Sequence, residues 1–305
     1  MRVMVNGVDI TDRYKIDRAV TRDSDGGEQD IFEVACTGKE AYTDIVRVKS
    51  DDVLTASMDG YSTGELYVHT AFGRDGKYAL SARGTRRSAD EKRWACYEDV
   101  TLMELMHLAA VELDMGFGQY GITDQKYKRL VRRDESWPMF LRRILRLESA
   151  VLKCTNGKLL AISIPWAQGQ KAVKAYDIAP NQSGCSYNET FEQYRECVLE
   201  EVEVTGKAVD IAVPGSRTLR PQGIDTDGNK ALARRWAAGE LLCMNRAARN
   251  VEMELPFDPE LAAMSRVDLT GLNVTQGKWL AGMVKHEPLQ KRTKMILRPC
   301  IETIT

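Results

Sequence analysis

The sequence predicts a mainly β protein of the α+β class, in which two small antiparallel, tube-like β-barrels flank an α+β insert. Alternating apolar and polar residues between hairpin dipeptides fill the first and last parts of the chain, and amphipathic helical patterns fill the middle. The length of 305 residues is enough for two to three domains of about 100–150 residues, each with its own core.

The predicted N-terminal β-barrel covers residues 1–97. Asn6-Gly7 and Asp75-Gly76 are hairpin dipeptides, because both residue types tolerate a positive φ. Between them, one run shows the period of two that half-buried strands require, with Leu66, Val68 and Thr70 alternating with Glu65, Tyr67 and His69.

The predicted insert covers residues 98–178. Its first helix begins with a capping box, Thr101 and Glu104, and has an apolar face of Leu102, Leu105, Met106, Ala109 and Leu113. Gly116 and Gly118 end this helix, and a polar stretch follows. Ser136 then caps a second helix, with Pro138 in its first turn and an apolar face of Trp137, Phe140, Leu141 and Ile144. A hairpin around Asn156-Gly157 joins strands at Val151–Cys154 and Leu159–Ile164.

The predicted second β-barrel covers residues 179–305 and includes one long helix, from about Lys230 to Arg249. A loop rich in Gly, Pro and Asp, residues 214–228, precedes that helix. The expected strands are Glu196–Val204, Ala208–Val213, a run through Val251, Met253 and Leu255, Ser265–Leu269, Lys278–Glu287 and Thr293–Leu297.

Composition narrows the class of function. The chain has 43 Lys+Arg and 44 Asp+Glu, a net charge of -1, which disfavours a dedicated binder of duplex DNA or anionic membranes. Seven widely spaced cysteines without a CxxC pair are typical of a reducing compartment. The early charges at the N-terminus and the lack of a long apolar window predict neither a signal peptide nor a membrane anchor.

No motif predicts catalysis, a metal or a cofactor. His69, His107 and His286 lie far apart, and the GxSxG, GxGxxG and P-loop patterns are absent. Glu200 and Glu201 point to opposite faces of a predicted strand, so they are expected to be solvated and not a catalytic pair.

A basic cluster is the strongest charge feature, with members Lys128, Arg129, Arg132, Arg133, Arg142, Arg143 and Arg146. It could contact nucleic acid. The favoured interpretation places Arg142, Arg143 and Arg146 on the solvated face of the second helix, as candidate contacts to another subunit or a spike. The cluster lacks interleaved aromatic residues for base stacking, so no specific nucleic-acid binding is expected.

Several segments occur in an order found in a known family. Asp134–Ile144 has the pattern acid-acid-Ser-Trp-Pro-Met-Phe-Leu-Arg-Arg-Ile, and a hairpin with Asn156-Gly157-Lys158-Leu159 follows. This order resembles the late control protein D family, the tail hub proteins of contractile phages and phage-like particles. Similar matches occur upstream and downstream, at Asn6–Thr11, Arg93-Trp94, Val100–Leu105, Leu261, Val267–Leu269, Gly277–Trp279 and Val284–His286.

Two residues depart from the family pattern. Ser265 stands where the family usually has glycine, and Gly282 interrupts the penultimate strand. These departures affect turns and leave the architecture unchanged.

The resemblance implies a structural baseplate hub that is not an enzyme. Three copies would form a homotrimeric ring whose six barrels match a sixfold tail tube and whose threefold symmetry matches a trimeric spike. Implied partners are the tube or tube-initiator protein, other baseplate proteins and the spike, a separate chain because no long β-helical repeat occurs before Thr305. DNA could pass through the lumen. Assembly would take place in the bacterial cytoplasm, and the chain would then belong to the baseplate of a virion or phage-like particle.

Two alternatives are a tail-tip enzyme that degrades cell walls and another tube or baseplate protein with the same barrel. Copy number separates the hub, at three per particle, from a tube protein, at six or more. Replacing Arg142, Arg143 and Arg146 with glutamate is expected to leave the monomer folded and to weaken assembly.

Overall fold

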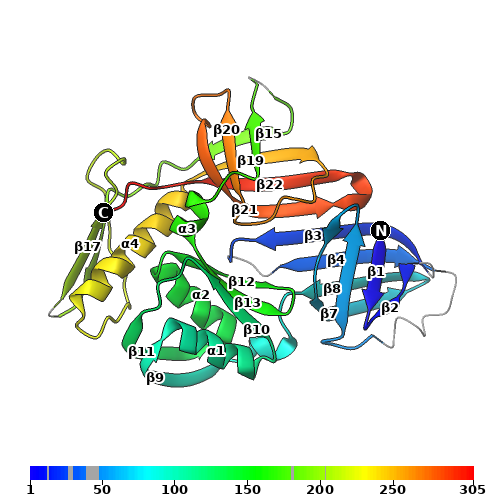
Figure 1. Cartoon of the computed structure of the whole chain (residues 1–305), viewed down its shortest axis with the longest axis horizontal. Coiled ribbons are helices and arrows are strands. Elements are labelled where there is room, and N and C mark those ends of the chain that lie inside the picture. The colour runs from blue at the N-terminus through cyan, green and yellow to red at the C-terminus, as the bar shows by residue number, and fades with distance from the viewer. Residues whose placement is uncertain (12–13, 27–29, 39–47, 180–181, 203) are drawn as a thin grey trace.

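Strands are the main secondary structure of the fold, and helices α1 (Leu102–Glu112), α2 (Trp137–Leu147) and α4 (Lys230–Ala247) lie on the side away from the N-terminal strands (Figure 1). The computed structural model describes residues 1–11, 14–26, 30–38, 48–179, 182–202 and 204–305. Within these residues, hydrogen bonds join 14 strands into one large sheet, and three smaller sheets lie beside it. The predicted class, mainly β with an α+β middle, is confirmed.

The N-terminal β region curls around a core that includes Val3, Phe32, Leu54 and Leu80. Its strands pair in the order β3-β4-β8-β7-β5-β1-β2, with β6 beside β5. Both predicted hairpins are confirmed, because Asn6-Gly7 and Asp75-Gly76 have positive φ and join paired strands. The strands are β1 (Arg2–Val5), β2 (Val8–Asp9), β3 (Lys15–Ser24), β4 (Ile31–Thr37), β5 (Val53–Met58), β6 (Tyr61–Ser62), β7 (Leu66–Arg74) and β8 (Lys77–Arg83).

The predicted alternation along β7 is wrong at Tyr67 and at Thr70. Leu66, Tyr67 and Val68 are all buried, and the Arg86 guanidinium lies 4.6 Å from the centroid of the Tyr67 ring. Thr70 is exposed, because the register between β7 and β8 shifts between Val68 and Thr70. A bulge of this kind interrupts the simple period of two.

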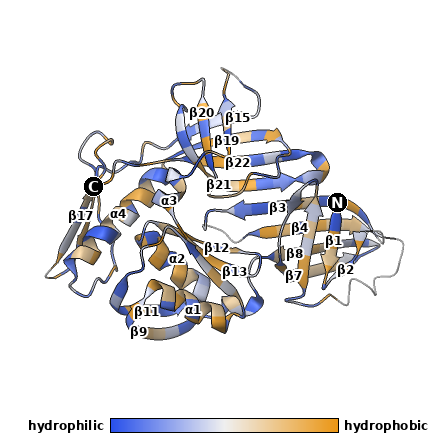
Figure 2. Ribbon diagram, in the orientation of Figure 1, coloured by the Kyte–Doolittle hydropathy of each residue, from blue (hydrophilic) through white to orange (hydrophobic). Residues whose placement is uncertain are grey.

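The middle of the chain contains both predicted helices and the predicted hairpin. The capping box is present, since Thr101 Oγ1 accepts from the Glu104 amide at 3.2 Å and Glu104 Oε2 accepts from the Thr101 amide at 2.7 Å. Figure 2 shows hydrophobic residues gathered on these helices and the hairpin. The elements are β9 (Arg93–Thr101), α1 (Leu102–Glu112), β10 (Gly116–Tyr120), β11 (Lys126–Glu135), α2 (Trp137–Leu147), β12 (Ala150–Thr155), β13 (Lys158–Ser163) and α3 (Ile164–Gly169).

The expected polar stretch after Gly118 is wrong, because it contains the end of β10 and all of β11. β10 pairs in parallel with β13 and is mainly exposed, so it has no apolar pattern. β11 pairs with β9 and buries Tyr127, Leu130 and Arg132. Because Arg132 is polar but lies on the buried side of β11, the strand does not show the alternation of apolar and polar residues that would identify it.

The C-terminal β region has its own core, which includes Val251, Val267, Trp279 and Leu297. Its strands are β14 (Lys174–Asp177), β15 (Cys185–Glu189), β19 (Arg249–Pro256), β20 (Arg266–Thr270), β21 (Gly277–Glu287) and β22 (Arg292–Pro299). The register of β21 and β22 shifts between Ala281 and Met283, so Gly282 lies at a bulge.

The long helix α4 (Lys230–Ala247) packs toward the insert. Leu232, Trp236, Ala237 and Leu241 belong to the same core cluster as the buried faces of α1 and α2. A small sheet covers α4 and contains β16 (Glu196–Glu200), β17 (Thr205–Val209) and β18 (Thr218–Leu219).

The two β regions are joined edge to edge, because β3 pairs antiparallel with β21 (Figure 1). The pairing connects Thr21–Ser24 to Met283–His286. The division at residues 97 and 178 into two barrels and an insert stays a proposal.

A buried charge cluster lies where the insert meets this joined sheet. The Lys153 side chain, 7% exposed, forms ion pairs with Asp23 and, at 3.8 Å, with Asp30. Asp23 Oδ2 also accepts from the Ala263 amide at 2.8 Å. Burial and the neighbouring Asp23 carboxylate raise the pKa of Asp30 above its ordinary value of 3.8.

We expect Asp30→Asn to change how stability depends on pH. Folded Asp30 keeps a proton that the unfolded chain releases above about pH 4, so its contribution is lost as the pH rises toward the raised pKa. An amide at this position does not titrate and would avoid the loss. As the pH rises, the free energy of unfolding of D30N relative to that of the wild type should therefore increase, by up to about 1.4 kcal/mol per pH unit.

Urea unfolding at several values between pH 4 and pH 8 measures this gain. The matched control is Asp59→Asn, because Asp59 is exposed and has a positive φ that asparagine tolerates. Parallel stability curves for D30N and the wild type would contradict the raised pKa.

Candidate interface surfaces

Helix α2 carries the three arginines predicted to lie at an interface. It begins at Trp137 because Ser136 Oγ accepts from the Met139 amide, at 3.4 Å, and Pro138 needs no hydrogen-bond acceptor in the first turn. Phe140, Leu141 and Ile144 are buried, as predicted. Arg142, Arg143 and Arg146 lie off this face, half-buried or exposed.

A groove of about 440 Å³ runs beside α2, and we name it the arginine groove. Helix α4, strand β11 and the loop at 221–225 form its other walls. Its charged lining residues are Arg129, Arg133, Glu135, Arg143, Arg146, Asp225 and Glu240. The groove therefore gathers members of the predicted basic cluster together with acidic residues.

Arg143 and Arg146 have partners within the chain. Arg143 donates to both carboxylate oxygens of Glu135, each at 2.8 Å, and to the Val131 carbonyl at 2.8 Å. Arg146 donates to Glu240 Oε2 at 2.8 Å. Burial raises the pKa of Glu135, but the hydrogen bonds from Arg143 outweigh it and hold this pKa below its ordinary value. These pairs connect α2 to β11 and to α4.

Of the other members of the basic cluster, Arg133 is exposed, and Lys128, Arg129 and Arg132 have partners of two kinds. Lys128 pairs with Asp227 at 2.8 Å and Arg129 pairs with Asp225 at 3.2 Å, both on the loop before α4. Arg132 is 1% exposed, with its guanidinium 4.6 Å from the Trp137 ring centroid, and it donates to backbone carbonyls. Arg132 is therefore a core residue, which the sequence pattern did not reveal.

Arg142 differs from its neighbours. It is half-buried, and its Nε has no hydrogen-bond acceptor among the described residues. It lines a second pocket, which Arg143 and Arg146 also border.

The interface role of all three arginines stays a prediction. Glutamate at positions 143 and 146 would face Glu135 and Glu240, so the triple replacement would also break two contacts within the fold.

Helices α2 and α4 meet around Glu148, which follows α2. Its carboxylate accepts from Trp236 Nε1 at 2.6 Å, from Tyr127 Oη at 2.9 Å and from Arg235 Nε at 2.7 Å. One acidic side chain thus satisfies donors from a strand and a helix, which holds the groove's walls in place.

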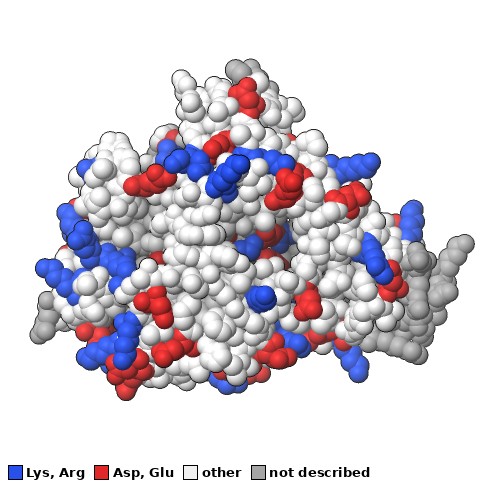
Figure 3. Space-filling view, in the orientation of Figure 1, with Lys and Arg blue, Asp and Glu red and all other residues white. Residues whose placement is uncertain are grey.

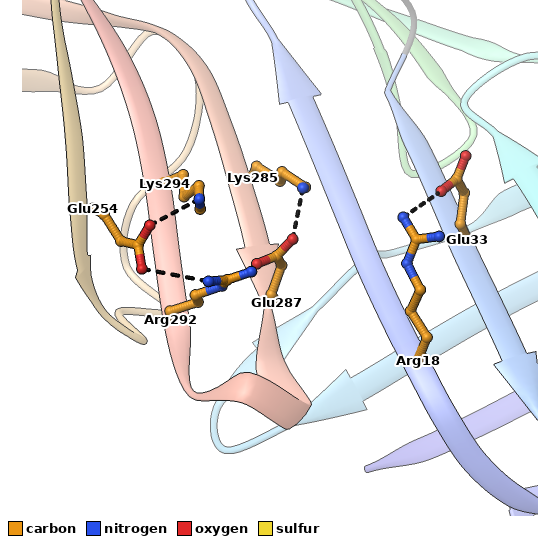
Figure 4. Close-up of polar contacts among 7 residues, drawn as sticks. All are labelled: Arg18, Glu33, Glu254, Lys285, Glu287, Arg292 and Lys294. Atoms are coloured by element: carbon orange, nitrogen blue, oxygen red, sulfur yellow. Dashed lines mark hydrogen bonds and ion pairs between the residues drawn. The ribbon is translucent and has the colours of Figure 1, made fainter. Parts of the chain in front are cut away.

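A second charged surface crosses β19, β22 and β21, and we name it the charged ladder (Figure 4). Glu254 lies between Lys294, at 2.8 Å, and Arg292, at 3.5 Å. Arg292 also pairs with Glu287, which Lys285 contacts at 2.6 Å. On β3 and β4, Arg18 and Glu33 form a similar pair at 3.4 Å. Such cross-strand pairs favour one register.

Both signs of charge are mixed over the molecular face in Figure 3. Basic side chains gather at the end that carries α4 and β17. A nearly neutral total charge therefore coexists with a local basic patch at one end of the molecule.

The three histidines lie apart. His107 is exposed and His69 is partly exposed. His286 is buried, and its Nδ1 and Nε2 lie 2.9 Å from Thr293 Oγ1 and 3.1 Å from the Leu261 carbonyl. Burial lowers the pKa of His286. Among the described residues, no group of three or more His, Cys, Asp or Glu side chains is placed to hold a metal ion.

Glu200 and Glu201, the two residues predicted to be solvated, have different environments. Glu200 is exposed and pairs with Arg220 at 2.5 Å. Glu201 is partly buried and accepts from the amides of Thr226, at 2.5 Å, and Gly228, at 3.4 Å. Glu201 thereby orders the loop before α4.

No protein-family model matches the sequence, and no curated protein matches it. Solved structures do match. The 43 kDa tail protein of prophage MuSo2 from Shewanella oneidensis has a TM-score of 0.75 at 12% identity, over 99% of this chain and 98% of that one. A tail protein from Neisseria meningitidis has a TM-score of 0.74 at 11% identity, over 98% and 95%.

A third similar structure is an E. coli protein described as a component of the type VI secretion system, with structural similarity to the T4 bacteriophage tail proteins gp27 and gp5. It has a TM-score of 0.59 at 9% identity, over 99% of this chain and 78% of that one. At these identities the likeness concerns the fold. The chain has a fold found in phage tail proteins.

We expect Gly239→Ala to destabilise the contact between α4 and α2. A Cβ at position 239 would lie 2.1 Å from the Leu147 carbonyl oxygen, so the helices would have to separate. Overpacking of this kind costs about 1–3 kcal/mol. Chemical unfolding measures the loss.

The matched control is Gly169→Ala, because a Cβ at position 169 in α3 has no atom within 4 Å. Its free energy of unfolding should stay within about 0.5 kcal/mol of the wild type. Equal stability of the two variants would contradict the close approach of α4 to α2.

Proposed function

We propose that this chain is a structural, non-enzymatic hub of a contractile tail or phage-like particle. Three copies form a ring that connects a sixfold tail tube to a threefold puncturing spike. The observation that carries the proposal is the similarity of fold to phage tail proteins over 99% of the chain. The late control protein D pattern around Trp137 supports the narrower assignment to the hub.

The sheet topology suits a ring of this symmetry. Two β regions joined through β3 and β21 give each subunit two β building blocks, so three subunits would supply six. The described sheet has β15 at one end of its pairing path and β2 at the other. Subunits arranged around an axis would place the C-terminal β region of one copy beside the N-terminal β region of the next.

The polar surfaces suit a protein with several protein neighbours. The arginine groove and the charged ladder present both signs of charge, which favours specific contacts with complementary partners. The expected partners are the tube or tube-initiator protein, a trimeric spike on a separate chain and other baseplate proteins. Among the described residues, no helix has the length and apolar character to cross a membrane. The proposed location is the baseplate of a virion or particle, after assembly in the bacterial cytoplasm.

We expect purified particles to contain three copies of this chain at the junction of tube and spike. Quantitative mass spectrometry gives the copy number, and a cryo-EM map of the particle gives the position. Six or more copies would indicate a tube protein.

The enzymatic alternative has a separate test. The purified 34.3 kDa chain, incubated with peptidoglycan, should release no soluble fragments. Release above that of a heat-treated sample would favour a tail-tip enzyme that degrades cell walls.

A further inference from the structure

A pocket of about 500 Å³ lies between α2, β12, α4 and β22, and we name it the Arg142 pocket. Its charged lining is strongly unbalanced, with five arginines against two acidic residues. These residues are Arg142, Arg143, Arg146, Arg246 and Arg298, and Asp25 and Glu240. The pocket therefore has an excess of positive charge, although the chain as a whole is nearly neutral.

Arg246, in the last turn of α4, is the buried group in this pocket. It is 3% exposed, and its nearest carboxylate oxygen, on Asp25, is 3.8 Å from Nη2. Neither its Nε nor its Nη2 has a hydrogen-bond acceptor among the described residues. A buried donor without an acceptor destabilises the fold, so an acceptor that reached this site would be bound favourably.

Asp25 cannot neutralise both arginines that surround it. Arg298 Nη1 donates to the two carboxylate oxygens of Asp25, at 3.4 and 3.2 Å. The single charge of Asp25 is thus shared between Arg298 and the more distant Arg246. Each of these guanidinium groups keeps donors for a further acceptor.

Arg142 lines the same pocket from α2. Its Nε is buried and has no acceptor among the described residues. Arg143 and Arg146 at the border of the pocket are already paired with Glu135 and Glu240. The unneutralised charge therefore concentrates on Arg142 and Arg246, with Arg298 beside them.

We propose that the Arg142 pocket binds a dianionic oxyanion of the phosphate class. Arginines from α2, α4 and β22 line the pocket, and the oxygens of a tetrahedral phosphate can accept from several guanidinium groups at once. Two negative charges match the excess positive charge better than one carboxylate does. The site does not depend on the proposed role in a tail.

The pocket also has an apolar wall, formed by Val151, Leu152 and Ile164. This wall can contact the organic part of a phosphate monoester. Free phosphate and a monoester share the chemistry that the arginines recognise, and they differ in their use of the wall.

The experiment uses the full chain at pH 8, where both anions carry two charges. Isothermal titration calorimetry and thermal unfolding compare inorganic phosphate, butyl phosphate and chloride at equal ionic strength. Saturable binding and a rise in Tm beyond that in chloride are expected for phosphate. Tighter binding of butyl phosphate would assign the site to monoesters, and equal binding would assign it to free phosphate.

Arg142→Gln is the principal variant, because the Nε that it removes has no acceptor among the described residues. Its Kd for phosphate should rise about tenfold, as expected for the loss of one hydrogen bond to a charged group. Arg234→Gln is the matched control, since Arg234 is exposed on α4 and lines a different pocket. Its Kd should not change, and both variants should keep the wild-type Tm in chloride.

Arg298→Gln, from another wall, provides a second test and should also weaken binding about tenfold. Three outcomes would overturn the proposal. These are no saturable binding of either phosphate compound, an unchanged Kd in R142Q that retains its fold, and tighter binding of the dicarboxylate glutarate than of phosphate.

Discussion

A lysine ammonium that leaves water must be paired with negative charge, and Lys153 imposes this requirement on the whole fold. Its negative partner, Asp23, and the neighbouring Asp30 carboxyl belong to the N-terminal β region, while Lys153 itself lies in the hairpin of the insert. Asp23 also accepts from the Ala263 amide, in the C-terminal part of the chain. Three segments that are far apart in sequence thus depend on one group of buried charges. The edge pairing of β3 with β21 lies beside this group and holds the same segments in register.

In the helical middle of the chain, other residues hold distant segments together. Glu148 collects donors from β11 and α4, and Gly239 allows α4 to approach the end of α2 closely. The apolar faces of α1, α2 and α4 then share one core. Because charge and close packing fix these walls, the arginines on α2 have defined positions at the groove and at the pocket.

Local signals in the sequence were sufficient for much of the fold. The capping box at Thr101, the Ser136 cap and the Asn-Gly and Asp-Gly dipeptides depend on residues only a few positions apart, and each is present in the structure. Strands β10 and β11 were missed because a paired but exposed strand and a buried arginine leave no apolar alternation. The candidate site was predicted only in part. The sequence placed Arg143 and Arg146 on a polar face, but the partner of Arg146, Glu240, is 94 residues away and comes close only through packing of α4.

The edge pairing between the two β regions has a mechanical consequence. β3 and β21 share four residue pairs, whereas β3 and β4 share seven and β21 and β22 share eight. Under tension, a short pairing between two regions carries fewer hydrogen bonds than the pairings on either side of it and parts before them. A pulling force across the subunit would therefore separate the two β regions along β3 and β21 as intact bodies. Each region would keep its own core, and the Lys153 charge group would be the next contact to resist.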